Sequence, residues 1–117
     1  MPVSPQELHI GSKAHAFSLP GTDGNVYSLR DFDNKHVLCI IFSCNHCPYV
    51  KAVEERINNI AKKYSDLSFV LLCINSNDEK VYPEDSFEEM KKRSEEKSFV
   101  FPYLRDESQT TAMAYDA

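Results

Sequence analysis

No stretch of this sequence is long and apolar enough to cross a lipid bilayer, which takes a run of about 18 residues. Residues 1–9 contain neither a basic region nor an apolar core, so we expect no secretory signal. Basic residues number 13 against 18 acidic ones, which gives a net charge of −5 at pH 7. This balance argues against a general role in binding nucleic acid or membrane surfaces. We therefore expect a cytoplasmic protein whose partners include no nucleic acid and no membrane.

The chain also has no internal repeat, no low-complexity tract and no linker-like segment. Its 117 residues suit a single domain. Of these residues 42% are hydrophobic and 26% are charged, a balance typical of a globular protein with a core. We predict one domain over residues 1–117.

A hairpin and a strand–helix–strand unit make up the first part of the predicted fold. Residues 15–19 and 26–29 are strand-like and flank a segment dense in turn formers, which predicts a β-hairpin. Residues 37–43 are apolar almost without alternation, which is typical of a strand covered on both faces. Residues 68–74 form a second apolar strand. With a helix between them, these two strands predict a parallel βαβ unit.

The helix of this unit is predicted from about His46 to Tyr64. Its apolar residues recur at spacings of three and four, which places them on one buried stripe. The stripe consists of Val50, Val53, Ile57, Ile60 and Tyr64. Glu54 falls off the stripe, so we expect it to be exposed to solvent.

The remaining segments predict two more helices and one strand, and the predicted fold class is α/β. Residues 83–90 open a helix with a capping box at Ser86 and Glu89, so the acidic residues from 84 to 89 are expected to be solvated. Residues 99–101 resemble a short strand. A final short helix is expected to start at residues 106–109.

Two pairs in these later segments are interpreted as local structure. Asp106 and Gln109 fit a capping box at the start of the final helix. Asn77 and Asp78 are expected to be ordinary turn residues after the second apolar strand.

The most specific motif is Cys44-Asn45-His46-Cys47, placed between the first apolar strand and the long helix. Two thiols at this spacing can close a disulfide ring and reopen it, which is the chemistry of a thiol–disulfide oxidoreductase. The helix N-terminus is expected to lower the pKa of Cys44. Because Cys44 should lie at the helix start and toward solvent, we assign it the attack. Cys47, shielded one turn further on, would resolve the mixed disulfide.

Three neighbours are expected to tune this pair. A protonated His46 would favour the Cys44 thiolate and make the pair more oxidising. Pro48 fits the first turn of a helix, where its missing N–H costs little. Asn45 is the other residue between the two cysteines.

The other two cysteines, Cys39 and Cys73, lie inside apolar runs and are interpreted as small buried hydrophobic residues. A zinc site would need four ligands, often as two close pairs, and no second CxxC exists. We therefore predict no metal and no cofactor. An inert thiol pair is a weaker interpretation, because CxxC in a βαβ setting is a fairly specific redox signal.

With these residues in view, the chain resembles the thioredoxin-like redoxin family, which includes the alkyl hydroperoxide reductase/thiol-specific antioxidant proteins. The segments that carry the resemblance are 11–20, 23–24, 28–32, 42–51, 74–78, 82–86 and 101–109. The resemblance implies a thioredoxin-like fold with an N-terminal hairpin and a central βαβ unit. It also implies an antioxidant or redox activity on protein or small-molecule thiols and disulfides, centred on a redox-active disulfide at the CxxC.

The chain departs from this family in three ways. Family members continue into a block with a cis-proline opposite the CxxC, two further strands and a helix, so we expect an incomplete domain. Its open sheet edge would favour pairing with a second copy, as a homodimer. Residues 37–43 contain no carboxylate that could serve as a general base, so proton transfer from Cys47 would need water, His46 or a carboxylate elsewhere in the chain. No proline precedes Cys44 nearby, unlike in peroxiredoxins.

Two alternatives to an oxidoreductase remain open at this point. A thiol peroxidase would form a sulfenic acid at Cys44 and then a Cys44–Cys47 disulfide. A non-catalytic thioredoxin-fold module would use the fold to bind a partner or a metal.

Overall fold

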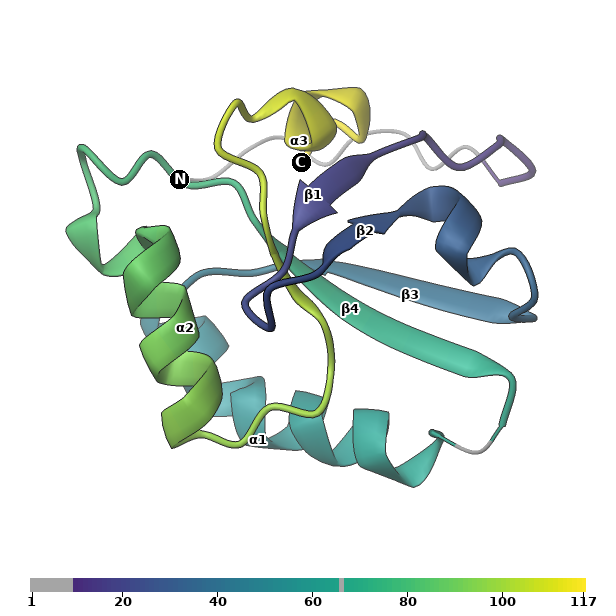
Figure 1. Cartoon of the computed structure of the whole chain (residues 1–117), viewed down its shortest axis with the longest axis horizontal. Helices are drawn as coiled ribbons and strands as arrows, with labels where there is room; N and C mark the ends of the chain where they lie inside the picture. Colours follow the sequence, from purple (N-terminus) through teal and green to yellow (C-terminus); the bar gives the residue numbers. More distant parts are fainter. Residues whose placement is uncertain (1–9, 66) are drawn as a thin grey trace.

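The structure is a computed structural model that describes residues 10–65 and 67–117. Within these residues the chain forms a three-stranded sheet, a two-stranded hairpin and three α-helices (Figure 1). In Figure 1, α1 (Pro48–Lys63) and α2 (Phe87–Glu96) lie along the lower and left sides, and the hairpin and α3 (Thr110–Ala114) lie along the top. The elements therefore cover the sheet from two sides.

The central sheet has the order β3-β4-β5, so β4 (Phe69–Asn75) lies in the middle. β3 (Val37–Phe42) runs parallel to β4 and is joined to it by α1 (Pro48–Lys63). β5 (Tyr103–Arg105) is also parallel to β4. This arrangement confirms the predicted βαβ unit, and it brings the carboxyl ends of the strands to one edge of the sheet.

The predicted hairpin is present, with β1 (Ser18–Pro20) antiparallel to β2 (Val26–Ser28). Its turn contains Gly24 at φ +89°, a left-handed conformation that favours glycine. A 3-10 helix, η1 (Leu29–Phe32), follows β2. Thr22 donates its backbone N–H to the carbonyl of Tyr103 at 3.0 Å, which ties the hairpin to β5.

Two apolar clusters lie on opposite faces of β4, because successive side chains of a strand point to opposite sides. The hairpin-side cluster contains Phe17, Leu19, Leu72, Ile74 and Leu104. The helix-side cluster contains Leu71, Cys73, Met90, Phe101 and Tyr103. The sheet is thus held between two separate cores.

β3 is less buried than its apolar sequence predicted. It is half-buried along most of its length, and Val37 is 51% exposed. The reason is that β3 is an edge strand: among the described residues, no strand pairs with its outer side. Pairing of this edge with a second copy stays a prediction.

The strand predicted at residues 99–101 is wrong, because the third parallel strand forms after Pro102, at Tyr103–Arg105. The segment is apolar for a different reason. The rings of Phe99 and Phe101 stack with their centroids 4.6 Å apart and pack against the helix-side cluster.

α1 buries a different face from the predicted stripe. Ile57 packs against the helix-side cluster, but Val53 and Ile60 are 37% and 43% exposed. Glu54, which was expected to be solvated, is buried instead. The helix is therefore rotated relative to the face predicted from apolar spacing alone.

Polar contacts explain this rotation. Glu54 accepts two hydrogen bonds from the guanidinium of Arg93 on α2, one of them at 2.9 Å from Nε. Asn58, also buried, accepts the backbone N–H of Val100 at 2.8 Å and donates to the carbonyl of Ser98 at 3.1 Å. These side chains join α1 to α2 and to the turn after it.

α2 (Phe87–Glu96) follows a short 3-10 helix, η2 (Pro83–Asp85). Ser86 caps α2 by accepting the backbone N–H of Glu89 at 3.3 Å, which is the Ser86 half of the predicted capping box. Of the two acidic residues in η2, Glu84 is exposed but Asp85 is fully buried. The burial of Asp85 contradicts the predicted solvation of this segment.

α3 (Thr110–Ala114) begins later than predicted, after Gln109 in a left-handed conformation. Asp106 is fully buried and accepts the backbone N–H groups of Thr111 at 3.3 Å and Ala112 at 2.9 Å. Asp106 therefore satisfies the start of α3, but not through the predicted pairing with Gln109.

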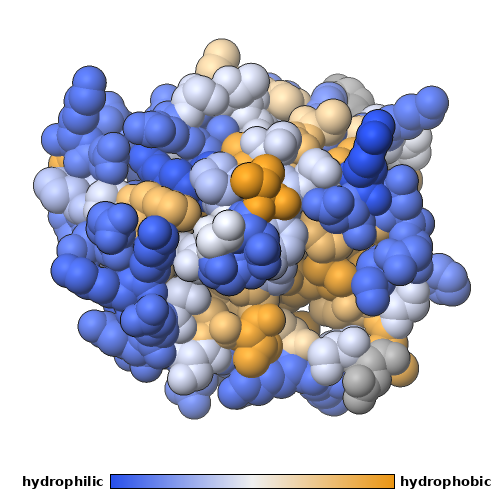
Figure 2. Space-filling model, viewed as in Figure 1, coloured by the Kyte–Doolittle hydropathy of each residue, from blue (hydrophilic) through white to orange (hydrophobic). Residues whose placement is uncertain are grey.

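Over the described residues, every helix is too short or too polar to span a membrane. Figure 2 shows hydrophilic residues gathered over α2, and hydrophobic residues toward the centre and right of the same face.

Candidate functional site

The CxxC motif lies between the end of β3 and the start of α1, at the carboxyl edge of the parallel sheet. Cys44 and Cys47 are both free thiols and both half-buried. The loop after β4 and the helix η2 contact the same turn, as the hydrogen bonds of Asn77 and Asp85 show. The carboxyl ends of parallel strands are a common place for sites in α/β sheets.

Cys47 is the N-cap residue of α1, and the helix begins at Pro48, two residues later than predicted. The carbonyl of Cys47 accepts the N–H of Lys51 at 3.0 Å, the first bond of the helix. The backbone N–H groups of Val50 and Tyr49 lower the pKa of the Cys47 thiol. Unpaired amides at a helix start stabilise a thiolate in this way.

Cys44 lies in the opposite electrostatic environment. Burial raises the pKa of its thiol, the backbone N–H of Cys47 lowers it, and the negative charges of Asp85 and Cys47 raise it, so the net shift is upward. The predicted lowering of the Cys44 pKa by the helix is therefore wrong. The reason is geometric, since the helix amides face Cys47, which stands where the helix begins.

Asp85 is the buried centre of the polar network beside this turn, with none of its surface exposed. Its Oδ1 accepts the backbone N–H of Asn45 at 2.5 Å and the side-chain amide of Asn75 at 2.9 Å. Its Oδ2 accepts the side-chain amide of Asn77 at 3.0 Å and faces Nδ1 of His46 at 2.5 Å. Burial alone would raise the pKa of Asp85, but these hydrogen bonds outweigh it and the net shift is downward.

The imidazole of His46 is fixed between two groups. Its Nδ1 contacts Asp85, and its ring stacks on Tyr82 with centroids 4.1 Å apart and planes 6° apart. His46 lowers the pKa of Cys44 through its backbone N–H. The predicted charge effect of the ring on Cys44 is replaced by a direct pairing of the ring with Asp85.

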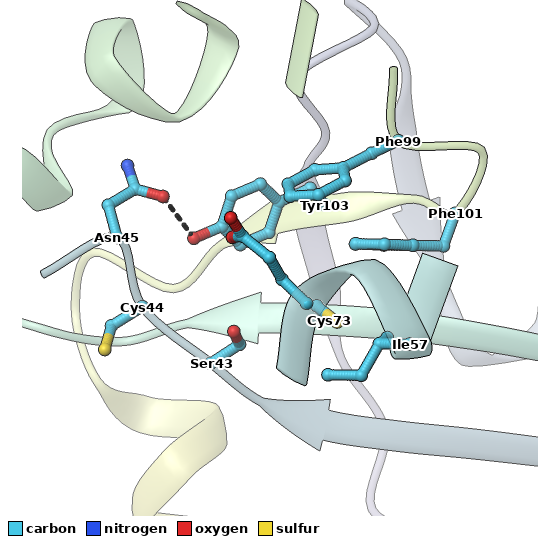
Figure 3. A pocket seen from close by; sticks show the side chains of 9 residues that line it. Ser43, Cys44, Asn45, Ile57, Cys73, Phe99, Phe101 and Tyr103 are labelled. Carbon is cyan, nitrogen blue, oxygen red and sulfur yellow. Dashed lines mark hydrogen bonds between the residues drawn. The ribbon is translucent and has the colours of Figure 1, made fainter. Parts of the chain in front are cut away.

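Asn45 anchors the turn to the rest of the fold. Its side chain is buried, donates to the carbonyl of Glu84 at 2.7 Å and accepts the hydroxyl of Tyr103 at 2.8 Å. Figure 3 shows this second bond, together with a Cys44 sulfur that points away from the aromatic rings of Phe99 and Tyr103. Burial raises the pKa of Tyr103, so its hydroxyl stays protonated and able to donate.

An open groove of about 440 Å³ adjoins both cysteines. Its apolar lining comes from the end of β3, the first turn of α1, β4 and α3: Phe42, Val50, Ile74, Ala112 and Met113. Asn77 and Gln109 add amide groups to the same groove. A substrate that carries a disulfide beside apolar groups therefore has a surface to lie on next to the thiols.

Cys44, His46 and Asp85 each place one potential metal-ligand atom within 4.8 Å of the others. Both carboxylate oxygens and Nδ1 of the imidazole already take part in hydrogen bonds within the protein. Structural zinc also takes four protein ligands. The arrangement fits a hydrogen-bonded carboxylate–imidazole pair, and we assign no metal to it.

The other two cysteines lie away from this chemistry. Cys73 is 1% exposed in the helix-side cluster, and burial raises the pKa of its thiol to about 12. Cys39 on β3 is half-buried against the same cluster. Both pack as small hydrophobic residues, as predicted.

Sequence reasoning missed three polar residues of this site: Asp85, Asn75 and Asn77. Asn77 was interpreted as a turn residue and Asp85 as a solvated acid. One signal was available for the two asparagines: Asn75 is the last residue of a central parallel strand and Asn77 lies two residues beyond it, at the carboxyl end where sites are common. Asp85 gave no such signal, because its segment fits an ordinary helix start.

The sequence model of the AhpC/TSA family matches residues 10–117. The crystal structure of an uncharacterized conserved protein from Geobacillus kaustophilus is 43% identical, with a TM-score of 0.89, over 100% of this chain and 63% of that one. That of a hypothetical protein from Sinorhizobium meliloti is 33% identical, with a TM-score of 0.90, over 94% of this chain and 60% of that one. The chain thus spans less than two thirds of the length of either protein.

A third structure is more distant. The thioredoxin domain of a thiol-disulfide oxidoreductase from Bacteroides vulgatus is 22% identical, with a TM-score of 0.74, over 95% of this chain and 76% of that domain. This likeness concerns the fold, and it confirms the thioredoxin-like α/β architecture. Among curated proteins, none matches the chain.

Proposed function

Because this chain belongs to the AhpC/TSA family, we propose that it is a thiol–disulfide oxidoreductase whose redox pair is Cys44 and Cys47. Thiol oxidoreductase or peroxidase activity is the general chemistry that the family and its structural neighbours indicate. The observation that carries the finer proposal is the placement of two free thiols in one turn at the start of α1.

The different environments of the two thiols favour an order of events. The Cys47 thiolate attacks a substrate disulfide, forms a mixed disulfide and releases one substrate thiolate, which takes a proton from solvent. Cys44 then loses its proton, attacks the Cys47 sulfur and releases the second substrate thiolate. Two electrons pass from the pair to the substrate, and the reverse sequence oxidises a dithiol. This order reverses the roles predicted from the sequence, because α1 begins after Cys47.

The groove beside the pair supports a substrate class of disulfides flanked by apolar groups, in proteins or in small molecules. Its lining is mostly apolar, with two amide side chains. Such a lining gains free energy when it covers apolar surface.

The proposal is tested by the redox midpoint of the pair in glutathione buffers, with the protein native and in urea, read by alkylation trapping and mass spectrometry. A native midpoint clearly displaced from that in urea is expected, because the fold places the two thiols in different environments. The Cys39→Ser variant is the matched control and should keep the native midpoint. Equal midpoints in the two conditions would remove the proposal.

A thiol peroxidase activity is the second candidate, favoured by the lowered pKa of Cys47 beside an open groove. The thiolate would take one oxygen from hydrogen peroxide to give a sulfenic acid and release hydroxide, which solvent protonates. Cys44 would then displace water from that sulfenic acid and form the disulfide. Rapid trapping of sulfenic acid at Cys47 supports this reaction, and oxidation as slow as that of free cysteine excludes it.

A further inference from the structure

We propose that Asp85 and His46 act together as the base that removes the proton from Cys44 in the resolving step. This inference rests on the proposed function and assigns a role to two residues that lie outside the redox pair. Cys44 Sγ, one ring nitrogen of His46 and one carboxylate oxygen of Asp85 lie within 4.8 Å of one another, although they come from the CxxC turn and from η2, about 40 residues later.

The hydrogen bonds of Asp85 determine which ring nitrogen of His46 can accept a proton. Three of its contacts are N–H donors from Asn45, Asn75 and Asn77. The lowered pKa of Asp85 keeps its carboxylate ionised, so it can only accept. Nδ1 of His46 must therefore carry the hydrogen at 2.5 Å from Oδ2, which leaves Nε2 as the free acceptor.

Two contacts fix the position of the His46 imidazole, and a general base must be held in position to accept a proton. Asp85 holds one edge of the ring, and Tyr82 covers one of its faces in parallel stacking. The His46 side chain is 25% exposed, while Asp85 has no exposed surface. The ring can therefore exchange a proton with solvent after the step, whereas the carboxylate stays fixed behind it.

The charges around the pair are compatible with this role. The titratable groups that face it are Cys44 from the CxxC turn, Tyr82 and Tyr103. Among the described residues, no lysine or arginine forms an ion pair with Asp85. Arg93, on the following helix, pairs with Glu54 instead. The carboxylate charge is thus free to stabilise a positive charge on His46.

The step conserves atoms and electrons. The proton moves from Cys44 Sγ to His46 through one water, which general-base catalysis allows. The electron pair left on Cys44 forms the new bond to Cys47 Sγ. The bond between Cys47 and the substrate sulfur breaks, and its electron pair leaves with the substrate thiolate. His46 then returns its proton to that thiolate or to solvent.

Asp85 has two opposing effects on Cys44, and this makes the test sharp. Its charge raises the pKa of the Cys44 thiol, so its removal should by itself make the thiolate more abundant. If Asp85 were only a source of charge, Asp85→Asn would speed resolution. If it supports His46 as the base, the same change slows resolution.

The experiment uses dithiobis(nitrobenzoic acid), an aromatic disulfide that releases one coloured thiolate at each exchange. In a Cys39→Ala background the first release reports the attack by Cys47, and the second reports resolution by Cys44. Asp85→Asn, His46→Ala and the double variant are compared by stopped flow, with circular dichroism as the check on folding. We expect each single variant to slow only the second release, by about a hundredfold.

The double variant should be no slower than His46→Ala, because residues that act as a unit are not additive. Added imidazole should restore the second release in His46→Ala, which lacks the ring. It should not restore it in Asp85→Asn, which still has His46. Additive effects, an unchanged or faster second release, or no rescue would overturn the proposal. His46→Ala keeps the proposal testable if Asp85→Asn does not fold.

Failure of the proposed function gives a different result. The Cys44→Ser variant should give the first release alone and a stable mixed disulfide on Cys47. If no mixed disulfide forms on Cys47, the order of exchange proposed above fails. If it forms but the Asp85 and His46 variants resolve normally, only the role of these two residues is lost.

Discussion

Replacement of Asp85 by alanine should destabilise the fold severely. The carboxylate is fully buried and accepts hydrogen bonds from Asn45, Asn75, Asn77 and His46. Asn77 and His46 are half-buried and can turn to water, but Asn45 and Asn75 are buried. The Asn75 amide keeps its bond to the Tyr103 hydroxyl at 3.3 Å, so one of its hydrogens and the Asn45 N–H lose their acceptor. A buried donor hydrogen left without an acceptor costs about 1–3 kcal/mol, so two of them predict a loss of about 2–6 kcal/mol.

That loss is large against the roughly 5–15 kcal/mol that stabilises a typical domain. The free energy of unfolding is measured by urea titration followed by far-ultraviolet circular dichroism. Glu84→Ala is the matched control, because Glu84 is exposed and offers only its backbone carbonyl to Asn45. We expect the control to change stability by less than about 0.5 kcal/mol. A loss in Asp85→Ala no larger than that of the control would refute the reasoning.

The same carboxylate makes a signed prediction about pH. The pKa of Asp85 is lower in the fold than in the unfolded chain, so its contribution to stability is present above the unfolded pKa. It is lost as pH falls through the folded pKa. Acid titration of stability should therefore be less steep below about pH 4 in Asp85→Asn than in the original protein, and equal slopes would contradict this.

Three further predictions concern other groups. Iodoacetamide should modify Cys47 at lower pH than Cys44, because the pKa of Cys47 is lowered and that of Cys44 is raised. Peptide mass spectrometry after pulsed labelling gives the order of modification, and the reverse order would contradict the prediction. The folded pKa of Cys73, about 12, lies above that of an unfolded thiol, so stability should fall as pH rises from about 9 toward 12, and less so in Cys73→Ala. Arg93→Ala should cost about 3 kcal/mol in a urea titration, because it leaves Glu54 buried without its partner, and a cost near zero would show that Glu54 reaches water.

The sequence allowed the architecture to be predicted because that information is local. The apolar runs at 37–43 and 68–74 and the helical spacing between them specify a βαβ unit without knowledge of any distant contact. The hairpin at 15–29 was predicted for the same reason, from its turn residues. Burial of β3 was overestimated because an apolar sequence does not say whether a strand has one neighbour or two.

The polar part of the site could not be predicted in this way, because its contacts are long-range. Asp85 meets Asn45 and His46 across about 40 residues of sequence. Its own segment has a capping serine and several acids, which fits a solvated helix start equally well. Glu54 was misjudged for a similar reason, since its partner Arg93 lies on another helix.

The start of α1 decides how the two thiols differ. Had the helix begun at His46, as its spacing predicted, its first amides would face Cys44 and would lower the pKa of that thiol. The bond from Asn45 to Asp85 and the pairing of the His46 ring with the same carboxylate hold these two residues outside the helix. The helix therefore starts one residue after Cys47, and its amides act on Cys47. The buried carboxylate of Asp85 thus helps to determine that Cys47 has the lower pKa and that Cys44 needs a base. Asn in place of Asp85 keeps an oxygen that can accept the Asn45 N–H, so in Asp85→Asn Cys47 should still be alkylated before Cys44 while resolution slows. A reversed order of alkylation in this variant would contradict the role given to the helix start.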